Sequence, residues 1–199
     1  MTYSDFSPAP LRARFAVIVL ALGLGLSACQ SPEPAVTSPP EGAASAASGG
    51  ASPQSIEDGY IAVGGSSSPF DTDLPPIARL DADLQSALQA AATAAGSDGI
   101  DMVVTSGWRS AEYQQSLLDA AVSKYGSLDE ARRWVNTPEK STHVTGDAVD
   151  IGDTDADSWL SQHGADYGLC QTYANEMWHF ELAIGPGQIC PVPRQDAAG

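Results

Sequence analysis

The chain has 199 residues, which is enough for one ordinary domain with a hydrophobic core but not comfortably for two. Its formal net charge is -16, from 9 basic and 25 acidic residues. Because phosphate backbones and anionic lipid headgroups repel such a surface, the charge argues against binding to nucleic acid and against charge-driven adhesion to membranes.

The first 28 residues are typical of a secretory signal rather than of a folded domain. Arg12 and Arg14 form a short basic region, and the apolar run at 15–26 is too short for a transmembrane helix. The run leads into Leu-Ser-Ala before Cys29, which resembles the lipobox of bacterial lipoproteins, where the cysteine becomes the lipidated first residue. We therefore expect a lipoprotein signal peptide at 1–28. The alternative is plain secretion with a cysteine nearby by chance.

Residues 29–55 then comprise the lipidated Cys29 and a linker rich in Pro, Ser, Ala and Gly. The linker has almost no large apolar residues, so it cannot bury enough surface to offset its ordering entropy, and we expect a disordered tether. Acyl chains on Cys29 would anchor the protein to the bacterial cell membrane on its extracytoplasmic side. We place the folded domain at 56–193 and a short tail at 194–199.

The folded region alternates between short strands and helices. Alternating or β-branched stretches predict the strands, and apolar residues at helical spacing predict the helices. The clearest helices are the one that ends at Gly96 and the one that Ser110 caps. This alternation indicates an α+β domain in which strand ends and loops carry the polar residues. In chain order we expect a strand at 58–63, a helix at 80–96, a strand at 100–105, a helix at 111–124, a helix at 128–135, a loop at 136–142, a strand at 148–151, a helix at 157–164 and a strand at 178–184.

Cys170 and Cys190 remain as an even pair once Cys29 is acylated. In an oxidising compartment a disulfide is the natural interpretation, and it would close a loop around the strand that carries His179. Such a bond would stabilise the fold by about 3 kcal/mol. Metal binding is the alternative, but no second Cys/His pair accompanies these cysteines at zinc-finger spacing.

Two of the three histidines fall within two short motifs, at 141–150 and 176–179. A hydrolytic zinc site needs about three nitrogen or oxygen ligands and one position left open for water. His143, Asp150 and His179 could supply such a set of ligands.

Glu176, three residues before His179, could be the carboxylate that takes a proton from water without itself being a ligand. Gly146 lets the chain turn, so that His143 on the loop and Asp150 on the strand can point at one spot. On these residues alone an alternative stays open, because scattered His and Asp side chains often form only ordinary hydrogen bonds at strand ends.

Three motifs resemble the zinc D-alanyl-D-alanine carboxypeptidases of the VanY type. The pattern of that family is Ser-x-His-x-x-Gly-x-Ala-x-Asp, then Glu-x-x-His with Trp before the histidine, preceded by Ser-Gly-aromatic-Arg-Ser. These motifs lie here at 141–150, 176–179 and 106–110, in the order of the family. The resemblance implies a single compact domain with a small antiparallel sheet flanked by helices, as in hedgehog and D,D-peptidase folds.

The resemblance also implies roles for individual residues. Arg109 corresponds to the arginine that holds the substrate carbonyl or carboxylate and steadies the developing oxyanion. Without the resemblance it would be interpreted as a surface or salt-bridge residue, and Gln114 as a solvated helix residue. Gln114 and Ser141 correspond to substrate contacts. The implied metal centre comprises one zinc ion, the ligands His143, Asp150 and His179, and the catalytic base Glu176.

The implied activity is hydrolysis of the terminal D-Ala-D-Ala bond of peptidoglycan stem peptides by a D,D-carboxypeptidase. Separately, we expect the protein to be a monomer. The same site could instead serve an L,D-carboxypeptidase, an endopeptidase or a D,D-dipeptidase, because the shape of the cavity decides among them. An alternative of another class is a non-catalytic lipoprotein that binds the cell wall, which is disfavoured because no ligand or base is missing. The chain departs from the common family residues at Trp108, Thr142 and Met177, which bears on substrate preference rather than on the ligands.

Overall fold

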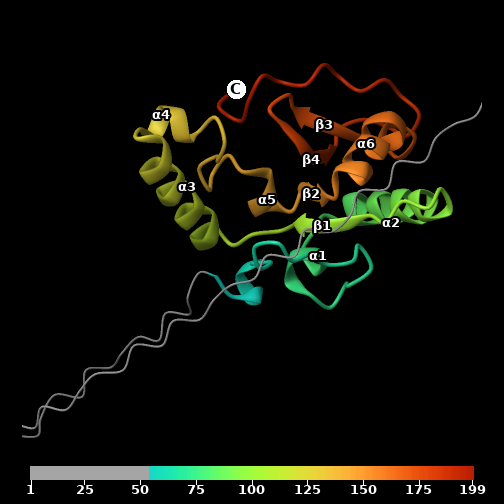
Figure 1. The fold of residues 1–199 in the computed structure, drawn as a ribbon, viewed down its shortest axis with the longest axis horizontal. Helices are drawn as coiled ribbons and strands as arrows, with labels where there is room; N and C mark the ends of the chain where they lie inside the picture. The colour runs from blue at the N-terminus through green and yellow to red at the C-terminus, as the bar shows by residue number, and fades with distance from the viewer. Residues whose placement is uncertain (1–53) are drawn as a thin grey trace, which may run out of the picture. The chain divides into compact units, whose positions relative to one another are not determined.

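A four-stranded antiparallel sheet forms the centre of the described residues, 54–199, in this computed structural model (Figure 1). The predicted signal peptide, Cys29 and the linker up to residue 53 lie outside the described residues. The strand order is β1-β2-β4-β3, which confirms the predicted α+β class with a small antiparallel sheet. The strands are β1 (Val103–Ser106), β2 (Ala148–Gly152), β3 (Leu169–Tyr173) and β4 (Glu176–Leu182).

Helices flank this sheet, and local signals fix where the two longest begin. Asp81 accepts hydrogen bonds from the first-turn amides of α2, and Ser110 accepts one from the amide of Tyr113 in α3. Within 54–199 no helix has the length and apolar character needed to cross a bilayer. The helices are η1 (Ile56–Asp58), α1 (Pro75–Ala78), α2 (Ala82–Ser97), α3 (Ala111–Tyr125), α4 (Leu128–Ala131), α5 (Thr142–Thr145), α6 (Thr154–His163) and η2 (Gly164–Tyr167).

The main core lies between one face of the sheet and the helices α2 and α6. From β2 it takes Val149 and Ile151, and from β4 it takes Phe180, which is fully buried. Because side chains alternate along a strand, the neighbours of these apolar residues project from the opposite face. A smaller core joins α3 to α4 beyond that opposite face, through Leu118, Ala121 and Ala131.

The predicted strand at 58–63 is wrong. The short helix η1 ends at Asp58, the chain turns at Gly59, whose φ is 86°, and residues 60–63 form neither helix nor strand. A Cβ atom on Gly59 would lie 1.9 Å from the carbonyl oxygen of Trp108, so only glycine permits this approach. The segment therefore packs against the turn before α3, and the amide of Ser110 in that turn donates a hydrogen bond to the carbonyl of Asp58.

Other differences concern the boundaries of elements and one strand. No strand is predicted at β3, which pairs with β4 as an edge of the sheet. The helix expected at 157–164 begins earlier, at Thr154, and the last strand begins at Glu176. Residue 142, predicted as the end of a loop, begins the single helical turn α5.

The C-terminal segment packs on the domain, although the sequence suggested a tail at 194–199. A disulfide joins Cys170 on β3 to Cys190, with their Cα atoms 5.7 Å apart. Beyond it, the amide of Arg194 donates to the carbonyl of Thr172, so the segment runs beside β3. This segment therefore belongs to the fold of the domain.

Candidate active site

Two of the candidate metal ligands face each other across neighbouring strands. Asp150 on β2 is opposite His179 on β4 in the antiparallel register. Their neighbours Val149 and Phe180 also form a pair, but these side chains enter the core under α2. The alternation of strand side chains therefore directs Asp150 and His179 to the other face of the sheet.

His143 joins them from the helical turn α5. The turn ends at Gly146, whose φ of 84° is left-handed and returns the chain directly into β2. A Cβ atom on Gly146 would lie 2.4 Å from the carbonyl oxygen of Arg79, so a side chain there has no room. His143 Nδ1 lies 2.8 Å from the carbonyl oxygen of Gly107, which can only accept and therefore places the ring proton on Nδ1. Nε2 is thus left facing the other two residues.

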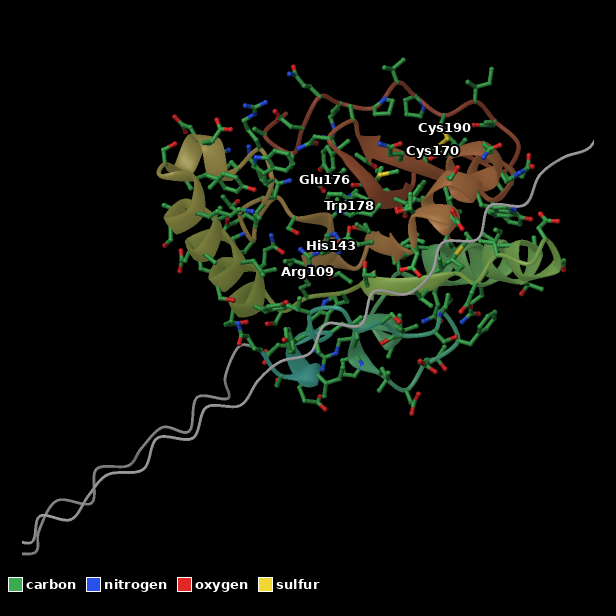
Figure 2. The ribbon with its side chains drawn as sticks, in the orientation of Figure 1. Arg109, His143, Cys170, Glu176, Trp178 and Cys190 are labelled. Carbon is green, nitrogen blue, oxygen red and sulfur yellow. A yellow bond between two sulfur atoms is a disulfide. The ribbon has the colours of Figure 1, made fainter. Side chains whose placement is uncertain are left out.

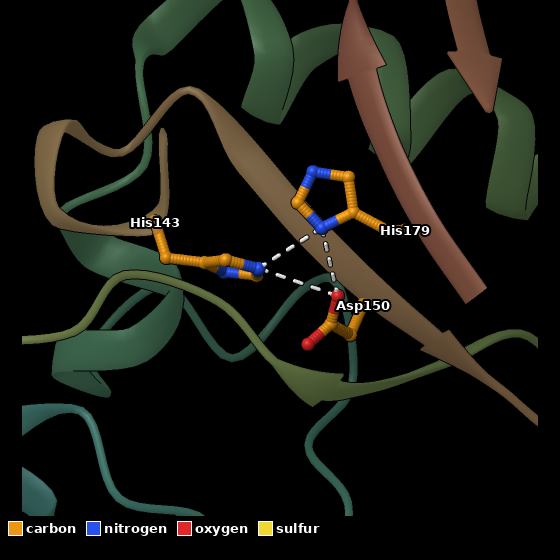
Figure 3. Close-up of side chains that lie close together, drawn as sticks. All are labelled: His143, Asp150 and His179. Atoms are coloured by element: carbon orange, nitrogen blue, oxygen red, sulfur yellow. Dashed lines mark hydrogen bonds and ion pairs between the residues drawn. The ribbon is translucent and has the colours of Figure 1, made fainter. Parts of the chain in front are cut away.

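The three side chains converge on one point (Figure 3). His143 Nε2 lies 3.2 Å from His179 Nδ1, and Asp150 Oδ1 lies 3.3 Å from the first nitrogen and 3.2 Å from the second. All three residues are buried, and their potential ligand atoms lie within 4.8 Å of one another. Two imidazoles and one carboxylate are a donor set that suits Zn²⁺, so these residues fit the predicted zinc site.

The electrostatics of this cluster are those of a cation site. Burial alone would raise the pKa of Asp150, but His143, His179 and Arg109 hold it well below its usual range. Burial and the nearby Arg109 lower the pKa of His143. Burial also acts to lower the pKa of His179, but hydrogen bonds with Asp150 and Glu181 raise it to about 9. The carboxylate of Asp150 is therefore ionised and lies between the imidazoles of His143 and His179.

Arg109 fixes the second oxygen of Asp150. Its Nη2 lies 2.8 Å from Asp150 Oδ2, Nε donates to Ser106 Oγ at 2.8 Å, and Nη1 donates to Gln114 Oε1 at 3.0 Å. Gln114 is only 1% exposed and donates from Nε2 to the carbonyl of Asn136, so it is not a solvated helix residue. It holds the guanidinium of Arg109 in place.

Glu176 supplies a second carboxylate close to the cluster. Its Oε2 lies 3.9 Å from His179 Nδ1, and its buried Oε1 has no hydrogen-bond partner among residues 54–199. Burial raises the pKa of Glu176 to about 7, although the charge of His179 opposes this. A carboxylate with a pKa near neutrality is suited to accept a proton and to return it.

All seven predicted catalytic, substrate-binding and metal residues line one cavity of about 240 Å³. Figure 2 shows the labelled Arg109, His143, Trp178 and Glu176 in the middle of the domain, between α3 and the sheet. Ser141 is buried at the start of α5 and lines the same cavity. The remaining lining residues are Leu117, Trp134, Val135, Asn136, Thr142, Tyr173, Trp178 and Ala197.

Glu181 and Ala197 are contacts of this site that the motifs do not indicate. Glu181 hydrogen-bonds His179 Nε2 at 3.0 Å, and its place two residues further along the same strand is a signal that could have revealed it. Ala197 reaches the cavity from the segment suggested as a tail, and no local pattern indicates that contact.

Comparison with known proteins identifies the family. The model of the VanY family, D-alanyl-D-alanine carboxypeptidase, matches residues 77–185, which is more than half of the chain. The chain belongs to the VanY family. The match contains the three motifs and every residue of the candidate centre, from Arg109 to His179.

Individual members of the family share under a third of their aligned residues with this chain. It is 30% identical to a D-alanyl-D-alanine carboxypeptidase of Enterococcus faecalis (strain ATCC 700802 / V583), over 56% of this chain and 52% of the relative. The chain thus spans about half the length of that curated relative. Among solved structures it is similar to a VanY D,D-pentapeptidase variant from the VanB-type vancomycin resistance cassette in complex with Zn(II). That match has 28% identity and a TM-score of 0.49, over 51% of this chain and 71% of the other. The chain is also similar to VanYB in complex with D-alanine-D-alanine, with 28% identity and a TM-score of 0.49, over 51% of this chain and 70% of the other.

Proposed function

We propose that this chain is a zinc D,D-carboxypeptidase that hydrolyses the terminal D-Ala-D-Ala bond of peptidoglycan stem peptides. The observation that carries the proposal is the convergence of His143, Asp150 and His179 beside a separate buried carboxylate, Glu176, in one cavity. Membership of the VanY family supports the substrate class.

One zinc ion would be held by His143, Asp150 and His179. When bound, it would lower the pKa of water towards neutrality and polarise the scissile carbonyl. The two histidines are already oriented for such an ion, because Gly107 and Glu181 hydrogen-bond their outer nitrogens.

Glu176 moves the proton in this proposal. Its carboxylate takes a proton from the attacking water and later delivers it to the nitrogen of the leaving D-alanine. In the metal-free protein burial raises the pKa of Glu176 to about 7, and its Oε1 has no other hydrogen-bond partner among the described residues, so the carboxylate is free to take and return a proton.

Arg109 supplies fixed positive charge beside the reacting carbonyl. Three of its N–H groups are engaged by Ser106, Gln114 and Asp150, so its position is set before the substrate binds. A pre-oriented charge costs no reorganisation during the reaction and stabilises the developing oxyanion. We assign a substrate contact to Ser141, which lines the cavity beside it. The buried Gln114, whose Oε1 and Nε2 are engaged by Arg109 and Asn136, would act by holding Arg109 rather than by contacting the substrate.

The alternative cleavages differ in which residues flank the broken bond. An L,D-carboxypeptidase, an endopeptidase or a D,D-dipeptidase could use the same four catalytic residues. The description of the family and that of the curated relative both support the D,D-carboxypeptidase. The non-catalytic alternative finds no support, because the ligands and the base are all assembled in the cavity.

We propose further that Cys29 carries a lipid anchor, which would place the domain outside the cytoplasmic membrane and beside the peptidoglycan. The small residues before Cys29 support lipidation, and the disulfide between Cys170 and Cys190 supports an oxidising compartment. The protein would act as a monomer, since one chain supplies every residue of the site. Substitution of Cys29 by Ala should release the protein from membranes, whereas continued membrane attachment would contradict the anchor.

Mass spectrometry of a muropeptide mixture before and after incubation with the zinc-loaded protein tests the activity. The D,D-carboxypeptidase converts pentapeptide stems to tetrapeptides with release of one D-alanine. Release of the D-Ala-D-Ala dipeptide would favour a D,D-dipeptidase, shortening of tetrapeptides an L,D-carboxypeptidase, and loss of cross-links an endopeptidase. An unchanged mixture would contradict an enzymatic function.

A further inference from the structure

A third carboxylate, Glu181, supports the candidate metal centre from outside the cavity. It lies two residues after His179 on β4, so both side chains project from the same face of the sheet. Its Oε1 lies 3.0 Å from His179 Nε2 and accepts a hydrogen bond of 3.0 Å from Thr142 Oγ1. The side chain is 18% exposed, so water competes only partly for these bonds.

This contact decides which nitrogen of His179 faces the cluster. A neutral imidazole has one N–H donor and one lone pair, and a carboxylate can only accept. Glu181 therefore keeps a ring proton on Nε2, so that Nδ1, which faces Asp150 and His143, is the nitrogen left to bind the metal. His143 is arranged the other way round, with its proton on Nδ1 and its Nε2 towards the cluster.

The same oxygen of Glu181 also ties two elements together. Thr142 is the first residue of α5, which carries His143, whereas Glu181 and His179 belong to β4. One carboxylate thus connects the turn and the strand that hold the two imidazoles. Removing it would take away the partner of His179 Nε2 and one link between α5 and β4.

We propose that Glu181 is a positioning residue of the metal centre, which fixes His179 in the Nε2–H form and holds α5 against β4. This inference rests on the proposed zinc site. Glu181 touches neither the cavity nor the reacting groups, so its contribution should be to zinc affinity rather than to bond cleavage. Loss of such a hydrogen-bond partner of a metal-binding histidine commonly weakens metal affinity by about 10- to 100-fold.

Zinc affinity, measured by competition with a chromogenic chelator, tests the proposal. Glu181→Ala should weaken zinc binding by about 10- to 100-fold, whereas Glu181→Gln should stay within a few-fold, because its amide oxygen can accept the same bond. Glu112→Ala is the matched control, because Glu112 is an exposed carboxylate in the first turn of α3 and should change nothing. Parental affinity in Glu181→Ala would overturn the inference.

The tautomers can also be observed in the unaltered protein, which avoids any variant that fails to fold. Nitrogen NMR of the zinc-loaded protein should find the remaining ring proton of His179 on Nε2 and that of His143 on Nδ1. A proton on Nδ1 of His179 would overturn the inference. The proposed function fails separately, if the unaltered protein binds no zinc or releases no D-alanine.

Discussion

Arg109 Nη2 lies 2.8 Å from Asp150 Oδ2, while the other oxygen of Asp150 faces the two histidines. One oxygen of the Asp150 carboxylate therefore contacts the guanidinium of Arg109, and the other faces the two histidine ligands. Exchange of Arg109 for Lys removes the planar fork that contacts Asp150, Gln114 and Ser106 together. We predict that kcat/KM for a pentapeptide falls by about 100-fold in this variant.

Arg132→Lys is the matched control for Arg109→Lys, because Arg132 does not line the cavity of the candidate site. Steady-state kinetics on both variants and zinc analysis of Arg109→Lys complete the test. A value of kcat/KM within a few-fold of the parent would show that Arg109 has no role in the reaction.

Zinc affinity should depend on pH through His179. Because its pKa is raised to about 9 in the metal-free protein, His179 carries a proton at pH 7 that the metal must displace. Zinc affinity should therefore rise about tenfold per pH unit between about pH 7 and pH 9 and level off above that range. Calorimetry in buffers with different ionisation enthalpies should detect the released proton. An affinity that does not change between pH 7 and pH 9 would contradict this account.

The ionised side chain of Asp157 should lower the free energy of unfolding at neutral pH. Burial and the charges of Asp150 and Asp153 raise its pKa to about 6, and its Oδ1 has no hydrogen-bond partner among the described residues. Between about pH 4 and pH 6 the native state keeps a proton that the unfolded chain has lost, so the free energy of unfolding falls as pH rises. Asp157→Asn removes this cost and should raise that free energy by about 1 kcal/mol at pH 7, allowing for solvent screening.

Urea unfolding at two pH values checks the prediction for Asp157. The gain of Asp157→Asn should largely disappear at about pH 3, where the carboxyl is mostly protonated in both states. Asp155→Asn, on the exposed side of the same helical turn, should have no such effect. An equal gain at both pH values would point to a cause other than titration.

The residues of the candidate site are predictable because they occupy contiguous motifs of rare chemistry. The chain has three histidines, and two of them lie in these motifs with Asp150 and Glu176. Their convergence also follows from local rules, since Asp150 and His179 alternate with the apolar core residues Val149 and Phe180.

The parts that are not predictable depend on contacts between distant segments. The strand β3 is a short edge strand of mixed polarity, and only its pairing with β4 defines it. At 58–63 the β-propensity of Tyr60 and Ile61 gives way to the turn at Gly59. The segment at 194–199 is held by contacts with Arg133 and Thr172, more than twenty positions away.

The C-terminal segment should contribute to substrate binding. Asp196 Oδ2 lies 2.8 Å from Arg133 Nε, and Ala197 lines the cavity. Removal of residues 194–199 would open this wall without touching the ligands or Glu176, so we predict a KM about tenfold higher and a kcat within about twofold. Steady-state kinetics checks the prediction. A parental KM in the truncated protein, or a kcat that falls with it, would contradict this role.

The most direct test of the account is a zinc titration of D-alanine release by the parent and by Glu176→Gln. Glutamine cannot accept the proton, but it leaves His143, Asp150 and His179 in place, so both proteins should bind one zinc ion. In the parent, the rate of release should reach its maximum at one equivalent of zinc, and in Glu176→Gln it should be lower by at least about 100-fold. A parent that releases D-alanine equally well without zinc, or a Glu176→Gln variant as active as the parent, would contradict the proposed mechanism.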